Sequence, residues 1–279
     1  MKVIKAINNN NLCVLDDEGR EQIVSGKGIG FGKKYGDTVD PSQIQKTYLI
    51  TDSELQKRMI SMLKEIPFEY MDFTNEIVEH IKKVYSSTLN ESLLVTLSDH
   101  IAFAIERKNK GIEFTNPLID SIRASYPEEL NLGEYCVEQM KKQLGIEMIA
   151  DEAGFIAMHI INARLDTKMD DVYSITKMIN GCVEIAEYYY KAQFDRNSAE
   201  YERFLTHLKY LAQRLFQNKP LSSAFCDDDE FLGMIKKTCK EHYKCALCIQ
   251  EYIEKTYHKN INDDELITLT IHLKKLSKN

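Results

Sequence analysis

Residues 25–36 read SGKGIGFGKKYG, and this stretch decides how the beginning of the chain folds. Positions 26, 28, 30, 32 and 36 are glycines. A helix does not tolerate this density, because each glycine costs about 1 kcal/mol relative to alanine in a helix interior. The neighbouring residues alternate short apolar runs with turn-forming residues, which is typical of antiparallel strands. We therefore predict a small antiparallel β domain over residues 1–55.

The strands expected in this domain are short and are separated by asparagine, aspartate and glycine. They are residues 3–7 (VIKAI), 12–17 (LCVLDD), 21–26 (EQIVSG), 29–34 (IGFGKK) and 45–50 (QKTYLI). The sequence DEGR at 17–20 favours a hairpin turn, because Gly19 can adopt a positive φ. So small a sheet buries little apolar surface and has open edges, so we expect it to pair with a second copy in a homodimer.

From about residue 53 the pattern becomes that of long amphipathic helices. Apolar residues recur at three- and four-residue spacing, as in Phe204, Leu208 and Leu211. Four histidines lie at repeated places in this region: His100, His159, His207 and His272. An Asp-Glu pair precedes both His159 and His272, with eight residues from each aspartate to its histidine. We predict two all-α bundle domains, at 65–169 and 170–279, divided near the polar stretch LDTKMDD.

Composition limits the classes of protein that remain. The chain has 279 residues, of which 43% are hydrophobic and 28% charged, which is ordinary for globular domains. We predict no signal peptide and no membrane insertion, since no window approaches the roughly 18 apolar residues of a membrane span. Seven scattered cysteines favour reduced thiols and a cytoplasmic location.

The net charge of −7 argues against a protein that coats nucleic acid non-specifically. Local charge differs from this average. Residues 1–15 and 22–36 contain no acidic side chain but carry two and three lysines respectively. A nucleic-acid partner would therefore be bound at these two stretches.

Motifs of common enzymes are missing from the sequence, so we predict no enzymatic activity and no cofactor. The glycine run resembles a nucleotide-binding loop only superficially, because the strand-to-helix turn that holds phosphate is not predicted there. A metal site is an alternative, since Cys239, His242, Cys245 and Cys248 are all zinc-ligand types. At three-residue steps they spread around half of one helix and cannot close a tetrahedron, although a pair could bind metal. We otherwise expect packed, metal-free cysteines.

The repeated histidines suggest a different chemistry. One histidine on an apolar helix face is ordinarily structural, but four in a repeated arrangement favour a function. Neutral imidazole is nucleophilic near pH 7 and can accept a phosphoryl group. The phosphate adds about two negative charges, enough to order or break an interface.

The chain resembles the BglG/LicT/SacY-type antiterminator family over essentially its whole length. IKAINNNNLCVL and SGKGIGFGKKYGDTVD are similar to the family's co-antiterminator RNA-binding domain, and the histidine pattern is similar to its two tandem phosphotransferase regulation domains. The resemblance implies a multidomain fold: a small dimeric antiparallel β domain followed by two all-α helical bundle domains. It also implies RNA-binding residues at Lys5, Asn8, Asn10, Gly26, Lys27 and Phe31, with Gly28 shaping the loop.

Those residue types suit RNA. Asparagine amides address base edges, lysines meet phosphates and Phe31 can stack on an unpaired base. The alternative is ordinary turn chemistry, because Asn and Gly clusters mark hairpins with or without RNA. The chain departs from the family at Lys27, where arginine is more frequent, so a forked contact becomes a point contact. It departs again at Asn11, where an apolar residue is usual.

The resemblance also implies phosphorylation at His100, His159, His207 and His272. The sugar-specific permease (enzyme II) would phosphorylate the first regulation domain and inhibit, whereas the phosphocarrier HPr would phosphorylate the second and activate. The active homodimer would hold a leader-RNA hairpin against an overlapping terminator. An alternative, a DNA-binding activator with the same regulatory domains, needs an N-terminal helix-turn-helix, for which the glycine-rich strands leave no space.

Overall fold

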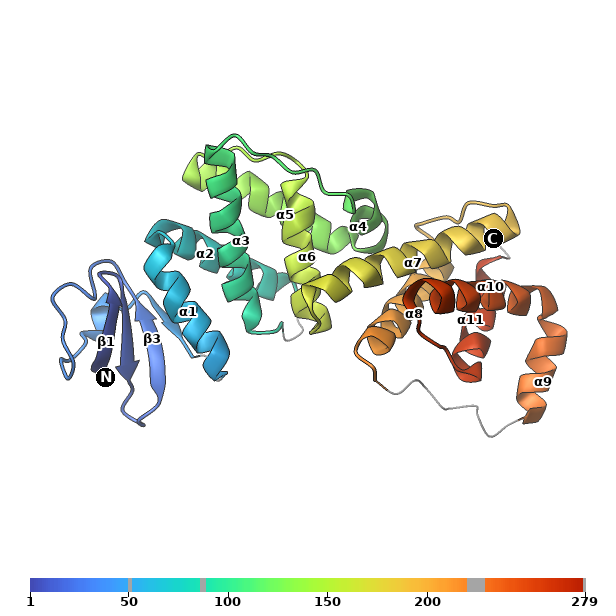
Figure 1. Cartoon of the computed structure of the whole chain (residues 1–279), viewed down its shortest axis with the longest axis horizontal. Coiled ribbons are helices and arrows are strands. Elements are labelled where there is room, and N and C mark those ends of the chain that lie inside the picture. Colours follow the sequence, from blue (N-terminus) through green and yellow to red (C-terminus); the bar gives the residue numbers. More distant parts are fainter. Residues whose placement is uncertain (50–51, 86–88, 220–228, 278–279) are drawn as a thin grey trace. The chain divides into compact units, whose positions relative to one another are not determined.

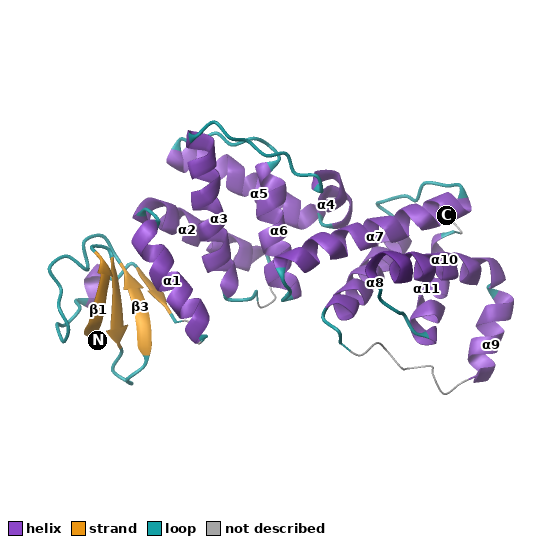
Figure 2. Ribbon diagram, in the orientation of Figure 1, coloured by secondary structure: helices purple, strands orange, loops and turns teal. Residues whose placement is uncertain are grey.

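The computed structural model describes residues 1–49, 52–85, 89–219 and 229–277. The chain divides into two compact units, one of Met1–Thr115 with Leu132–Arg164 and one of Asn116–Asn131 with Leu165–Asn279. Strands occur at the N-terminal end and helices follow (Figure 1, Figure 2). A small antiparallel β domain followed by a helical region is therefore confirmed. The boundaries at 55, 65–169 and 170–279 stay a prediction.

Four strands form the N-terminal sheet, in the order β1-β2-β3-β4 with antiparallel pairing throughout. They are β1 (Lys2–Asn8), β2 (Asn11–Leu15), β3 (Glu21–Ser25) and β4 (Lys46–Tyr48). In the central pair Leu12 lies opposite Val24 and Cys13 opposite Ile23. Because side chains alternate across a sheet, these two pairs face opposite sides.

The strand predicted at 29–34 is wrong. Turns run through residues 27–32, and Gly28 and Gly32 have φ of 73° and 69°, which a β-strand excludes. The chain rejoins the sheet edge only afterwards, where the Val3 amide donates to the Asp37 carbonyl at 2.8 Å. The glycine run is therefore a loop.

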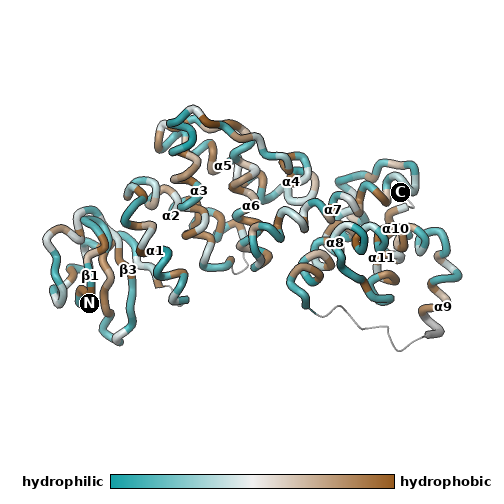
Figure 3. The backbone as a smooth tube through the Cα atoms, in the orientation of Figure 1, coloured by the Kyte–Doolittle hydropathy of each residue, from teal (hydrophilic) through white to brown (hydrophobic). Residues whose placement is uncertain are grey.

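Both faces of the sheet are covered. Ile7, Cys13 and Ile23 pack against helix α1 (Ser53–Glu65) through Met59 and Leu63. The opposite face forms a second buried cluster with the loop and its continuation: Val3, Leu12, Val14, Val24, Ile29 and Val39. Apolar residues are therefore consecutive in β2, whereas hydrophobic and hydrophilic stretches alternate along the helices (Figure 3). The loop is thus anchored to the sheet by its one buried isoleucine.

Besides α1, the helices of the first unit pack around one apolar core. They are α2 (Phe68–Val84), α3 (Ser92–Asn109), the part of α5 (Pro127–Gln139) from Leu132 onward, the π-helix η2 (Met140–Leu144) and α6 (Glu152–Leu165). Buried residues from all five of these helices meet in this core, including Ile77, Ile101, Cys136, Met140 and Ile160. This packing fixes α3 and α6 side by side.

The second unit is also helical. It contains α4 (Ile119–Ser125), α7 (Met169–Tyr190), α8 (Ala199–Phe216), α9 (Asp229–Thr238), α10 (Lys240–Tyr257) and α11 (Asp263–Leu276). Helix α11 packs on α8 and α10, and α7 packs on α4, α8 and α10. The apolar stripe predicted from Phe204, Leu208 and Leu211 is buried, as expected. Asn262 caps α11, because its Oδ1 accepts from the Glu265 amide at 3.0 Å.

Residues 1–49 contain one 3₁₀ turn (Pro41–Gln43) besides the strands, and no helix-turn-helix occurs within that range. The alternative of a DNA-binding activator therefore lacks the helix-turn-helix that would contact DNA in this range. In the four described ranges, no helix is both long and apolar enough to cross a membrane.

Candidate functional site

The loop of residues 26–36 is docked on the turn that joins β1 and β2. The Gly26 amide donates to the Asn10 carbonyl at 2.9 Å, and the Gly30 amide donates to the Asn9 carbonyl at 2.9 Å. The Asn10 side chain adds a third bond, because its Oδ1 accepts from the Gly28 amide at 2.8 Å. The structure thus brings Asn10, Gly26 and Gly28 together.

Exposure separates the predicted RNA-binding residues. Lys5, Lys27, Gly28 and Phe31 are exposed, Asn8 and Asn10 are partly buried, and Gly26 is buried. Phe31 is the most informative, because 76% of an aromatic surface is left in water although burying it would be favourable. An exposed ring in a loop that also carries exposed lysines is suited to stacking on a base.

Asn8 has structural contacts on both ends of its amide. Its Nδ2 donates to the Leu63 carbonyl near the end of α1, and its Oδ1 accepts from the Asn10 amide at 2.8 Å. The same oxygen accepts from Asn11 Nδ2 at 3.0 Å. Asn11 is buried, and this bond satisfies its amide nitrogen. Direct RNA contact by Asn8 stays a prediction.

Tyr35 is a further candidate for RNA contact that the sequence analysis did not identify. It lies in the same loop as Phe31 and is 82% exposed. The sequence does show an aromatic residue between Lys34 and Gly36 in a predicted turn, where an apolar core is not expected to bury it.

A first histidine cluster joins α3 and α6. The ring centroids of His100 and His159 are 4.7 Å apart. His100 Nε2 lies 2.7 Å from Glu152 Oε1, and Arg107 Nη2 lies 3.1 Å from Glu152 Oε2. The carboxylate of Glu152 therefore lies between a histidine and an arginine, and its side chain is only 3% exposed. We call these four residues the first cluster.

A second cluster in the other unit repeats the arrangement between α8 and α11. The ring centroids of His207 and His272 are 4.9 Å apart. His207 Nε2 lies 3.1 Å from Glu265 Oε2, and Arg214 Nη2 lies 2.5 Å from Glu265 Oε1. The Glu265 side chain is 2% exposed and that of Arg214 28%.

The spacing explains the geometry. Each arginine follows the first histidine of its pair by seven residues, and each glutamate precedes the second by seven. Seven residues are close to two helical turns, so the two side chains share one face. The histidine pairs were expected from the sequence, but Arg107 and Arg214 were not. The sequence does contain a pattern that could have identified them: an arginine follows both His100 and His207 by seven residues, which is about two helical turns.

One histidine of each pair is held neutral. Burial, with the nearby His100, lowers the pKa of His159 to about 3. Burial lowers the pKa of His272 to about 4, with contributions from His207, Lys275 and Arg203. Burial alone would raise the pKa of Glu265, but hydrogen bonding to His207 and the charge of Arg214 outweigh it and hold that pKa low. At neutral pH each cluster therefore holds an uncharged imidazole, and in the second cluster the Glu265 carboxylate is charged.

These shifts predict loss of stability in mild acid. The pKa of both histidines is lower in the folded chain than the unfolded value of about 6.5, so below pH 6.5 the unfolded chain binds protons that the folded chain does not. Between pH 6.5 and pH 5 each histidine should lower the free energy of unfolding by up to about 2 kcal/mol. Denaturant unfolding at several pH values should show a weaker pH dependence in His159→Asn and His272→Asn. Exposed His258→Asn is the matched control, and an unchanged slope in both cluster variants would contradict the assignment.

The cysteine-rich segment has a different environment. Cys245 is buried on α10, and burial raises its pKa to about 12, which disfavours the thiolate that zinc requires. His242 Nδ1 lies 2.8 Å from the Tyr190 hydroxyl. Among the residues that the structure describes, no group of three or more potential ligands is arranged to hold a metal ion.

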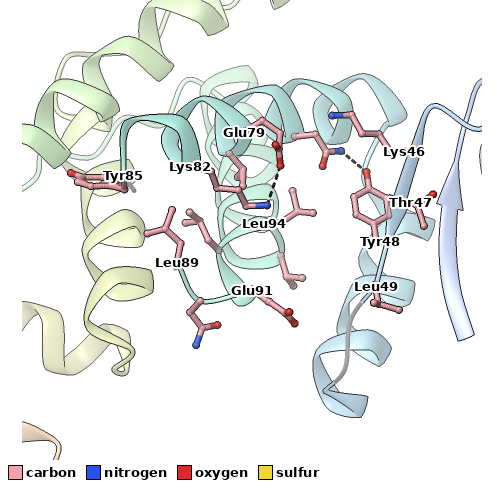
Figure 4. Close-up of a pocket in the computed structure, with 15 residues that line it drawn as sticks. Lys46, Thr47, Tyr48, Leu49, Glu79, Lys82, Tyr85, Leu89, Glu91 and Leu94 are labelled. Carbon is pink, nitrogen blue, oxygen red and sulfur yellow. Dashed lines mark hydrogen bonds and ion pairs between the residues drawn. The ribbon is translucent and has the colours of Figure 1, made fainter. Parts of the chain in front are cut away.

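A hollow of about 740 Å³ lies in the first unit between β4 and helices α2 and α3 (Figure 4). Asn75 donates to the Tyr48 hydroxyl at one end, and Lys82 pairs with Glu79 at 3.0 Å along its wall. Burial raises the pKa of Tyr48 to about 12, so its hydroxyl stays protonated at any ordinary pH. The lining includes none of the predicted site residues.

Family models match nearly the whole chain. Residues 1–57 match the CAT RNA binding domain, and residues 75–163 and 180–276 match the PRD domain. The first match contains the loop, and the two others contain one histidine cluster each.

Full-length relatives and a solved structure agree with these matches. The chain is 38% identical over 278 residues to transcription antiterminator LicT of Bacillus subtilis (strain 168), covering 100% of this chain and 99% of the relative. It is 35% identical over 276 residues to the beta-glucoside operon antiterminator of Dickeya chrysanthemi, covering 99% and 96%. The crystal structure of GlcT CAT-PRDI is similar at a TM-score of 0.51 and 34% identity, covering 58% of this chain and 96% of that one.

Proposed function

The chain belongs to the BglG/LicT-type family of transcription antiterminators, and from this premise we propose that it binds a leader-RNA hairpin and is switched by histidine phosphorylation. One observation carries the proposal: two helical units repeat the same cluster of two histidines, a glutamate and an arginine. A structural need for buried histidine would not require the same four residue types at the same spacing twice.

RNA would be bound by the N-terminal domain as a homodimer. Lys5 and Lys27, both exposed, would meet phosphates, and Asn10 would hold the loop on which Phe31 is displayed. Gly26 and Gly28 keep this loop close to the β1–β2 turn. The bound hairpin would exclude an overlapping terminator hairpin, so that polymerase reads through.

The two clusters would receive phosphoryl groups from different donors in the cytoplasm. The sugar-specific permease would act on His100 and His159, and HPr on His207 and His272. A neutral imidazole is the nucleophile that this transfer needs, and the low pKa of His159 and His272 supplies it.

The surrounding charges support opposite effects at the two clusters. Lys275 and Arg203 both act on His272, so a phosphate there would meet positive charge beyond that of Arg214. At the first cluster Arg107 is the cation that contacts Glu152, and the charge acting on His159 is that of His100. A phosphate would then be neutralised more fully at the second cluster than at the first.

Phe31 gives the direct test of RNA binding. Phe31→Ala is expected to weaken binding of the full chain to its leader hairpin by about 1–3 kcal/mol, because one base loses its stacking partner. Its thermal stability should be unchanged, since the ring is 76% exposed. Affinity is measured by titrating labelled RNA at fixed salt.

Tyr188→Ala is the matched control, because Tyr188 is also a highly exposed aromatic residue but lies on helix α7, outside the N-terminal domain. It should bind RNA as the unmodified chain does. Equal losses in both variants, or unfolding of Phe31→Ala, would remove Phe31 from the binding surface.

A further inference from the structure

Both clusters place an arginine on the far side of the glutamate that holds a histidine. In the first, Glu152 Oε1 faces His100 and Oε2 faces Arg107. In the second, Glu265 Oε2 faces His207 and Oε1 faces Arg214. One carboxylate thus connects a proposed phosphorylation site to a guanidinium, and does so twice.

We propose that Arg107 and Arg214 are phosphate-receiving positioning residues, which exchange the glutamate for the phosphoryl group when a histidine of their cluster is phosphorylated. This inference rests on the proposed function and identifies how the chain holds the modification. Arg107 and Arg214 would each contact two phosphoryl oxygens through the planar guanidinium.

The transfer itself needs no further reactant. The lone pair of a neutral imidazole nitrogen in the cluster attacks phosphorus in the phosphohistidine of the donor protein, forming a new N–P bond. The donor N–P bond breaks, and its electron pair returns to the donor imidazole nitrogen. The phosphoryl group brings its oxygens and negative charge with it, and each ring keeps the proton on its other nitrogen.

Charge makes the exchange necessary. Before transfer the glutamate, almost fully buried, is balanced by its arginine. After transfer about two further negative charges lie next to that carboxylate. The guanidinium is the cation already in contact with the cluster, and the phosphoryl oxygens are the stronger acceptors. The glutamate keeps its contact with the ring of His100 or His207.

The two arginines differ in how tightly their side chains are packed. The guanidinium carbon of Arg107 lies 5.2 Å from the ring centroid of Phe103 and 4.7 Å from that of Phe114. Arg214 is more exposed, 28% against 8%. The second cluster is therefore the better place for the test, because the arginine can move without repacking aromatic rings.

The experiment measures phosphoryl occupancy of the full chain at equilibrium with phosphorylated HPr. His100→Ala and His159→Ala are present throughout, so that only the second cluster reports. Arg214→Gln should lower the equilibrium constant for transfer by about tenfold or more, because charge-assisted bonds to the phosphate are lost. Glu265→Gln, which removes the competitor for Arg214, should not lower it. Arg196→Gln breaks an arginine–glutamate pair with Glu187 and should change nothing.

Opposite behaviour of the two cluster variants separates this role from a structural ion pair. If Arg214 and Glu265 only held each other, Arg214→Gln and Glu265→Gln would lower occupancy alike, and the inference would be overturned. Arg214→Lys keeps the charge and guards against unfolding; it should recover part of the occupancy, and failure to do so in a folded chain also counts against the inference.

Phosphorus NMR adds a spectroscopic reading. Contact with a guanidinium favours the dianion, so the pKa of the phosphoryl group should be higher in Arg214→Gln than in the unmodified chain. An unchanged phosphoryl pKa would overturn the inference alone. Absence of any phosphorylation in the chain with an intact second cluster would overturn the proposed function as well.

Discussion

Alanine at His207 and His272 together is expected to abolish the stimulation of read-through by HPr, while alanine at His100 and His159 together makes read-through independent of sugar. Substitution of His207 and His272 removes the site where phosphate is accommodated among Arg214, Arg203 and Lys275. Substitution of His100 and His159 removes the inhibitory phosphate. Coupling energies of this kind change activity by about 5- to 150-fold. A terminator-reporter assay with and without sugar measures both.

Folding must be controlled in these variants. Removing His207 leaves Glu265 with Arg214 as its partner, so packing should survive, and circular dichroism checks that it does. His258→Ala, an exposed histidine outside the repeat, is the control for loss of a histidine as such. Well-folded variants of both clusters that shift read-through in the same direction would contradict opposed control.

Gly30→Ala is expected to abolish measurable binding of RNA and to destabilise the N-terminal domain by about 1–3 kcal/mol. An added Cβ would overlap the carbonyl oxygen of Asn8, so the loop that carries Phe31 must leave the β1–β2 turn. Denaturant unfolding and RNA titration of the same preparation measure the two effects.

Gly233→Ala provides the comparison, because nothing lies within 4 Å of the position of its Cβ and it belongs to helix α9. It should leave RNA binding unchanged and stabilise the helix by up to about 1 kcal/mol. Normal RNA affinity in Gly30→Ala would show that the close approach of the loop to Asn8 is not needed for binding.

The sequence predicted the strands that are short apolar runs between turn residues, and it failed where glycine dominates. β1, β2 and β3 contain such runs, which the sequence alone reveals. Residues 29–34 were predicted as a strand although they contain two glycines. The positive φ of Gly28 and Gly32 shows that this segment is a loop. Such dihedral angles depend on what the loop docks against, which is Asn9 and Asn10.

The candidate sites were predictable to a similar extent. Repetition along the chain identifies His100 and His207 as counterparts, but an arginine two turns later has meaning only when the opposing helix places a glutamate there. Asn8 was predicted as a contact to RNA from the resemblance. Its bond to the Leu63 carbonyl could not be predicted, because it depends on how α1 packs on the sheet.

Single-round transcription in vitro tests the central claim most directly. The template carries the leader transcribed from the DNA directly upstream of this chain's coding sequence or of a neighbouring permease gene, with its overlapping hairpins. Purified chain should raise the fraction of transcripts that pass the terminator, phosphorylated HPr should raise it further, and Phe31→Ala should reduce the effect. Transcripts that end at the terminator equally with and without the chain, although the chain is folded, would contradict the account.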